Sequence, residues 1–108
     1  MKMNHDDVLS AVGLAYRAKK VTIGFDPISQ QARMGTVSLI VLAADCSEGT
    51  AKSYKNKCQY YQIPCIQYGT RETIGKSVGK QNISAVAICD DGFAALVLKK
   101  FGGEILWQ

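Results

Sequence analysis

One stretch near the start of the chain, residues 23–45, constrains the fold more than any other part of the sequence. It contains a glycine turn, a short polar helix and then an apolar run at 39–43 that leads to a carboxylate. Asp26 is expected to cap the helix and Pro27 to be its first residue, where a missing N–H costs nothing. Gly35 is expected to close the helix in the left-handed conformation. The apolar run predicts a strand that is covered on both faces.

The start of this helix also has a chemical consequence. The first N–H groups of a helix have no partner within it, so a helix that begins at a glycine turn offers donors that suit phosphates. Lys and Arg outnumber Asp and Glu by 13 to 9, which gives a net charge of +4. This mild excess is compatible with a nucleic-acid partner and equally with a solvated basic surface.

Length and composition limit the remaining possibilities. The 108 residues are enough for one domain with a buried core. No apolar run reaches the roughly 20 residues that span a bilayer, and the N-terminus lacks the apolar segment of a secretory signal. We therefore expect a cytoplasmic protein that does not bind membranes.

The four cysteines show neither a CxxC pair nor the spacing of metal ligands. Cys58, Cys65 and Cys89 lie among apolar residues and are expected to be small core residues. The only histidine, His5, lies near the start of the chain. We expect free thiols, no bound metal and no cofactor.

Hydrophobic periodicity predicts an alternating order of elements. Helices are expected at 4–18 (with Asn4 as cap), 26–34, 47–62, 70–78 and from Asp90 or Asp91 onward. Strands are expected at 21–23, 39–43, 65–66 and 84–89, with an additional edge strand at 105–107. This alternation favours a sheet between layers of helices. Gly75 and Gly79 form a GxxxG pattern in a short polar helix, which indicates close packing there rather than a membrane dimer.

Motifs for catalysis are not found. The sequence has no GxGxxG, P-loop, GxSxG or HExxH pattern. Asp90 and Asp91 stand where helix caps belong, so capping explains them better than acid–base chemistry. Cys46 follows Asp45 at a strand end but has no histidine to serve as its base. We do not expect an enzyme.

Four segments occur together in the order and spacing of a known family. They are the turn–helix–strand unit at 24–44, the strand 63–66, the helix start 70–75 and the strand 84–88. Over residues 7–99 the chain resembles the L7Ae/L30e ribosomal-protein superfamily, which binds kink-turn RNA, and above all its small bacterial YlxQ-type branch. The resemblance implies one RNA-binding domain over 1–108: an α/β fold, a three-layer α-β-α sandwich with a central mixed sheet of about four strands.

The resemblance also implies two RNA-binding segments. The first is the glycine turn and the start of the second helix, with Gly24, Phe25, Asp26 and Gln30. The second is the loop before the last strand, with Lys80, Gln81, Asn82 and Ile83, and with Ser84 at its edge. Arg33, Lys52, Lys55 and Lys80 are further phosphate contacts or simply solvated charges.

Ile83 admits two interpretations. It is either the first core residue of the last strand, or an apolar residue at the loop tip that packs against a base outside the RNA stack.

The first segment departs from the best-known family pattern. Asp26 and Pro27 stand where Asn and Glu are usual, and Gln30 stands where a lysine is usual. A carboxylate cannot donate to guanine O6 or N7 as an amide does, and a missing lysine removes a phosphate contact.

The leading hypothesis is a non-enzymatic binder of structured RNA, above all ribosomal RNA rather than DNA. The alternative is a protein-interaction module that keeps the fold without RNA binding. An enzyme acting on RNA ranks third, and the sequence says nothing of the oligomeric state.

Overall fold

In the computed structural model, which describes residues 6–106, helices and strands alternate along the chain. The elements are α1 (Asp7–Arg17), β1 (Val21–Ile23), α2 (Phe25–Arg33), β2 (Leu39–Leu42), α3 (Glu48–Tyr61), β3 (Cys65–Gln67), α4 (Arg71–Ser77), β4 (Ala85–Ile88) and α5 (Asp91–Phe101). This is the predicted order, with most bounds within two residues of those expected from the sequence.

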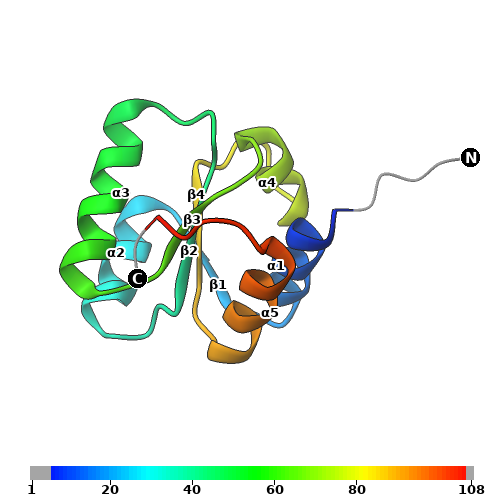
Figure 1. Ribbon diagram of the computed structural model, residues 1–108, viewed down its shortest axis with the longest axis horizontal. Helices are drawn as coiled ribbons and strands as arrows, with labels where there is room; N and C mark the ends of the chain where they lie inside the picture. The colour runs from blue at the N-terminus through cyan, green and yellow to red at the C-terminus, as the bar shows by residue number, and fades with distance from the viewer. Residues whose placement is uncertain (1–5, 107–108) are drawn as a thin grey trace, which may run out of the picture.

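The strands form one mixed sheet in the order β1-β4-β2-β3. Strand β4 pairs antiparallel with β1 and β2, whereas β2 and β3 are parallel. Helices α2 and α3 lie on one side of the sheet, and α1, α4 and α5 lie on the other (Figure 1). The expected three-layer α-β-α sandwich is therefore confirmed.

Alternate residues of β2 supply the two halves of the core. Leu39 and Val41 pack into the cluster under α1, α4 and α5, whereas Ile40 and Leu42 pack into the cluster under α2 and α3. All four residues of β2 are buried, which confirms that both of its faces are covered. Burying each such side chain contributes roughly 1.5–3 kcal/mol to stability.

The caps of the first two helices differ from those expected. Asp6 caps α1, with its carboxylate accepting the N–H of Leu9 at 3.0 Å, and Asn4 lies outside the described residues. Gly24, not Asp26, occupies the N-cap of α2, with φ at 101° and without a side-chain hydrogen bond to the helix. Helix α2 thus starts earlier than expected because β1 ends at Ile23 and a single glycine makes the turn between them. Asp26 and Pro27 lie within the first turn of α2.

Glycines at three other positions behave largely as expected. Gly35 follows the end of α2 with φ at 77°, which confirms the left-handed closure. A Cβ on Gly75 would lie 2.0 Å from the carbonyl oxygen of Gln81, so this glycine permits the predicted close packing. Gly79 has nothing within 4 Å of its Cβ position, and its φ of 68° shows that it serves to end α4 instead.

The expected edge strand at 105–107 is wrong for the residues that are described. Ile105 and Leu106 form no strand, and Trp107 lies outside the described range. This segment is joined to the sheet by a backbone hydrogen bond, in which the N–H of Leu106 donates to the carbonyl of Cys65 in the edge strand β3 at 2.7 Å. A single bond of this kind does not make a ladder.

The cysteine thiols are free. Cys58 on α3 and Cys65 on β3 are fully buried in the same core cluster, as predicted, and Cys89 is half-buried beside it. The hydrogen bond with Cys65, together with burial, raises the pKa of the Cys58 thiol. Burial likewise raises the pKa of Cys46, so this thiol is a poorer nucleophile than an exposed one.

Two further observations concern residues 6–106 alone. No group of three or more His, Cys, Asp or Glu side chains is arranged to hold a metal ion. No helix in this range has both the length and the apolar character needed to cross a membrane.

Candidate nucleic-acid interface

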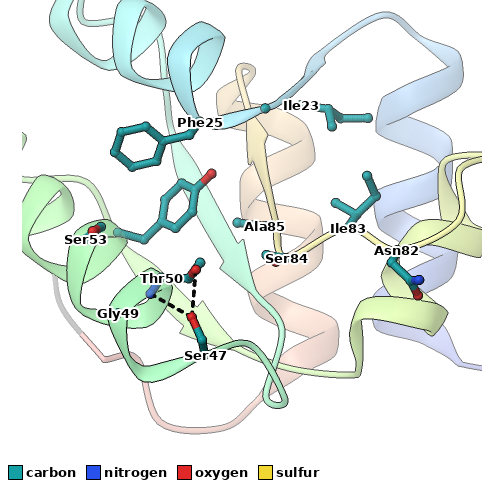
Figure 2. Close-up of a pocket in the computed structure, with 12 residues that line it drawn as sticks. Ile23, Phe25, Ser47, Gly49, Thr50, Ser53, Asn82, Ile83, Ser84 and Ala85 are labelled. Atoms are coloured by element: carbon teal, nitrogen blue, oxygen red, sulfur yellow. Dashed lines mark hydrogen bonds between the residues drawn. The ribbon is translucent and has the colours of Figure 1, made fainter.

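A groove of about 750 Å³ lies at one end of the sheet, between α2, α3 and the segment that leads into β4. Figure 2 shows its lining, which comes from three separate parts of the chain. These parts are residues 23–25, the first turns of α3 and residues 82–85. The fold brings them together because β4 lies between β1 and β2 in the sheet, so the ends of all three strands are neighbours.

The first wall is the turn from β1 into α2. Gly24 has a positive φ that permits the sharp turn, and no side chain accepts a hydrogen bond from the first N–H groups of the helix. The Phe25 ring reaches from this turn to α3, where it meets Tyr54 edge to face at a centroid distance of 5.3 Å. This wall therefore combines free backbone donors with an aromatic surface.

The second wall is the start of α3, which sequence reasoning missed. The Ser47 hydroxyl oxygen caps the helix by accepting the N–H of Thr50 at 3.1 Å, and the Ser47 hydroxyl donates to the Thr50 oxygen at 2.9 Å (Figure 2). Ser53 continues this polar edge of the groove, and Gly49 keeps it open. Ser47, Thr50 and Ser53 recur every three residues, a spacing that would have predicted a hydroxyl-bearing helix face.

The third wall is the segment before β4, and α4 holds its backbone in place. Lys80 donates its N–H to the Gly75 carbonyl at 2.8 Å, and Ile83 donates its N–H to the Arg71 carbonyl at 3.0 Å. The start of α4 is fixed in turn by Asp45, whose carboxylate accepts the Arg71 N–H at 2.8 Å. The segment is therefore positioned before any ligand arrives.

Ile83 takes a position between its two predicted roles. It is half-buried and packs against the core cluster under α1, α4 and α5, yet it also lines the groove. Figure 2 shows the side chains of Ile23 and Ile83 close to one another, on the side of the groove away from α3, and both pack against the core cluster under α1, α4 and α5. Together they provide an apolar surface at the edge of the groove opposite the polar edge of α3.

The structure brings some of the predicted site residues together and leaves others apart. Those that line the groove are Gly24, Phe25, Asn82, Ile83 and Ser84. Those that are exposed nearby, on α2 or on the loop, but do not line it are Asp26, Gln30, Lys80 and Gln81. Arg33 lies in the last turn of α2, about 12 Å along the helix axis from Phe25 at 1.5 Å per residue. It does not line the groove.

The electrostatics of the groove suit binding of a polar ligand. Tyr54 is the one titratable side chain among the lining residues that the structure describes. Burial raises the pKa of Tyr54 to about 12, so its phenol is neutral at physiological pH. Lys57, one turn further along α3, holds its ammonium 5.0 Å from the centre of the Phe25 ring. Hydroxyls, an amide, apolar surface and a cation at the rim are a combination typical of nucleic-acid contacts.

Comparison with known proteins confirms the family resemblance that the sequence motifs indicated. The sequence profile of the ribosomal protein L7Ae/L30e/S12e/Gadd45 family matches residues 6–98. The RNA-binding protein YlxQ of Bacillus subtilis is 40% identical over 83 residues, which is 77% of this chain and 83% of that protein. The large ribosomal subunit protein eL30 of Methanosarcina mazei is 34% identical over 94 residues, covering 85% of this chain and 84% of that one.

Solved structures show the same architecture. A protein of unknown function from Bacillus halodurans superposes with a TM-score of 0.87 at 29% identity, covering 92% of this chain and 100% of that chain. A 15.5kD RNA binding protein from Giardia lamblia superposes with a TM-score of 0.73, covering 93% of this chain and 88% of its own. The second pair is only 17% identical, so it supports the fold alone.

Proposed function

Because this chain belongs to the ribosomal protein L7Ae/L30e/S12e/Gadd45 family, we propose that it is a non-enzymatic binder of structured RNA. The proposed target is a sharply bent, kink-turn-like element, with ribosomal RNA in the cytoplasm as the expected source. The names of the YlxQ relatives, which describe RNA-binding proteins, support the general part of this proposal.

The groove is the observation that carries the proposal. The glycine turn at the start of α2 and the segment at 82–84 are almost 60 positions apart in the sequence, and both line this one groove. These are the two segments that the family resemblance implies to be RNA-binding. To contact both sides of a bent RNA, a protein needs two such segments side by side on one surface.

Each wall has a distinct proposed contact. The open start of α2 offers backbone N–H groups to phosphates or base edges. Ile83 and Ile23 offer an apolar surface to a base that has left the stack, and Asn82 offers an amide to its edge. Asp26 is exposed beside these groups and accepts hydrogen bonds only, so it favours exocyclic amino groups of bases over guanine O6 or N7.

The proposal is tested by titrating the protein with a kink-turn RNA and with a straight duplex of equal length, each at several salt concentrations. We expect tighter binding to the kink-turn. The logarithm of affinity should fall linearly with the logarithm of salt concentration, with a slope of roughly −0.7 to −0.9 for each phosphate contact. Equal and negligible binding to both RNAs would contradict the proposal.

That negative result would favour the alternative, a protein-interaction module that has kept the fold. Two observations support this alternative. Gln30 stands where the family usually has a lysine, and the Arg33 guanidinium is carried by the last turn of α2, away from the groove. Fewer cations near the groove mean a weaker sequence-independent contribution to RNA affinity.

A further inference from the structure

Phe25 is unusually exposed for a side chain with a fixed position. Its exposed fraction is 45%, whereas its contact partner Tyr54 is only 4% exposed. The two rings meet edge to face, with an interplanar angle of 74°. Since the Tyr54 side chain, carried by α3, is locked in the core, the Phe25 ring is held in one orientation while much of its surface faces solvent.

A cation is held beside the same ring. The Lys57 ammonium lies 5.0 Å from the centre of the Phe25 ring and 5.9 Å from the centre of the Tyr61 ring. Attraction to the two ring faces holds the ammonium in place. Within residues 6–106, no carboxylate forms an ion pair with Lys57, so no acidic side chain in this range neutralises its charge.

We propose that Phe25 and Lys57 form a second nucleotide-binding subsite at the rim of the groove. An unpaired base stacks on the exposed surface of the Phe25 ring, and the Lys57 ammonium binds the phosphate of that nucleotide. An aromatic face with an adjacent free cation matches the two parts of a nucleotide, a flat base and an anionic phosphate. An apolar partner surface would match the ring but leave the charge unpaired.

The occupant is a nucleotide of the same RNA that fills the groove. Phe25 lines the groove and also carries the rim contact with Lys57, so the two sites are continuous. The inference therefore rests on the proposed function, and it extends the RNA contact beyond the groove and along α3.

Substitution of Phe25 separates stacking from simple apolar contact. Phe25→Leu keeps an apolar side chain but removes the aromatic face, whereas Phe25→Tyr keeps the face. We expect Phe25→Leu to weaken binding of a kink-turn RNA about 5- to 150-fold, the usual range for loss of one base–aromatic stack. Phe25→Tyr should stay close to wild type. Leu14→Ala is the matched control, because Leu14 is 46% exposed on α1 in the opposite layer.

Fluorescence identifies the stacked nucleotide directly. Each unpaired nucleotide of the RNA is replaced in turn by 2-aminopurine, whose emission is quenched when it stacks. We expect one position at which wild-type protein quenches the emission and Phe25→Leu does not. Lys57→Gln should make the salt slope shallower by about 0.7 to 0.9, the contribution of one phosphate contact, whereas Lys99→Gln on α5 should not.

The outcomes distinguish the two proposals. If wild-type protein binds the kink-turn RNA and Phe25→Leu binds it equally well, the subsite is wrong and the proposed function stands. An unchanged salt slope for Lys57→Gln would also overturn the phosphate contact. If wild-type protein binds neither the kink-turn nor the duplex, the proposed function itself fails. Melting temperatures of all variants show whether a loss of binding reflects loss of fold.

Discussion

The two segments proposed to contact RNA are fixed in opposite ways. The segment before β4 is tied to α4 by backbone bonds from Lys80 and Ile83 to the carbonyls of Gly75 and Arg71. The start of α2 has no side-chain cap, whereas the other four helices each have one. One wall of the groove thus rests on bonds within the protein, and the other leaves backbone donors for a ligand.

Because of this difference, we expect one wall to bind RNA through its side chains and the other through its backbone. In the proposed RNA complex, Asn82 and Ile83 would contribute through their side chains, which are presented on a prearranged backbone. The turn at Gly24 would contribute through its backbone N–H groups. The departures from the family pattern at Asp26 and Gln30 leave the N–H groups of α2 in place, whereas Pro27, the third residue of the helix, removes one of them.

The largest effect is expected from Gly75→Ala, which disturbs the segment at 80–84 that is bonded to α4, here called the anchored wall. The new methyl group would lie 2.0 Å from the Gln81 carbonyl oxygen, and backbone atoms of this kind cannot move aside as a flexible side chain does. We expect a loss of about 3 kcal/mol or more of unfolding free energy, at the upper end of overpacking costs. Chemical denaturation measures it, and RNA binding should fall with the displaced segment.

Gly79→Ala is the control for this prediction, since it changes the other glycine of the same pattern. Its Cβ position is open, and only its φ of 68° opposes the substitution. A cost of about 1–2 kcal/mol is expected for the left-handed conformation. If both variants lose equal stability, the close contact between α4 and the segment at 80–84 is not what anchors the wall.

A smaller effect is expected from Gly24→Ala, which strains the uncapped start of α2 at residues 24–27, here called the open wall. Gly24 has φ at 101°, and a Cβ there would lie 3.3 Å from Cδ of Pro27. We expect a loss of about 1–3 kcal/mol for this backbone conformation, together with weaker RNA binding, because the first N–H groups of α2 would be re-aimed. Gly35→Ala at the other end of α2 also carries a positive φ but should leave the RNA affinity unchanged. Equal losses of affinity in the two variants would contradict a role for the turn.

Most of the fold could be predicted from the sequence because its signals are local. Hydrophobic runs and caps such as Asp90 set the element order, and the structure confirms that Asp90 caps α5. Asp26 was misassigned because a cap residue and a first-turn residue are chemically alike. Only the positive φ of Gly24 distinguishes the two cases, and the sequence does not encode that angle directly.

The site was only partly predictable, because it depends on which strand ends are neighbours. The family resemblance indicates two of the three segments that line the groove. The start of α3 lies beside them because the strand order β1-β4-β2-β3 places the end of β2 next to the start of β4. The edge-to-face packing of Phe25 against Tyr54 is likewise a contact between separate elements. The sequence leaves Arg33 as either a phosphate contact or a solvated charge, and the length of α2 carries it away from the groove.

Ile83→Ala separates the structural and binding roles of the anchored wall. Ile83 is half-buried, so truncation should cost about 1–2 kcal/mol, less than the ~2–5 kcal/mol typical of a fully buried isoleucine. We also expect the substitution to reduce the affinity for a kink-turn RNA more than the affinity for a duplex, because an apolar contact with an unstacked base is lost. Denaturation and titration of one preparation provide both numbers. Unchanged discrimination between the RNAs in folded protein would assign Ile83 to the core alone.

The smallest effect is expected from Gln30→Lys, which adds a charge to the open wall. Gln30 is exposed on α2, four positions after Asp26, so the new ammonium would share its time between that carboxylate and the RNA. We expect the affinity for a kink-turn RNA to rise by no more than about fivefold, since exposed ion pairs contribute about 0–1 kcal/mol. The salt slope should steepen by about 0.7 to 0.9 if one phosphate contact forms. Ser10→Lys on α1 adds the same charge in the opposite layer and should leave the slope unchanged. Identical slopes for both variants would mean that position 30 meets no phosphate, and the open wall would then act through its backbone alone.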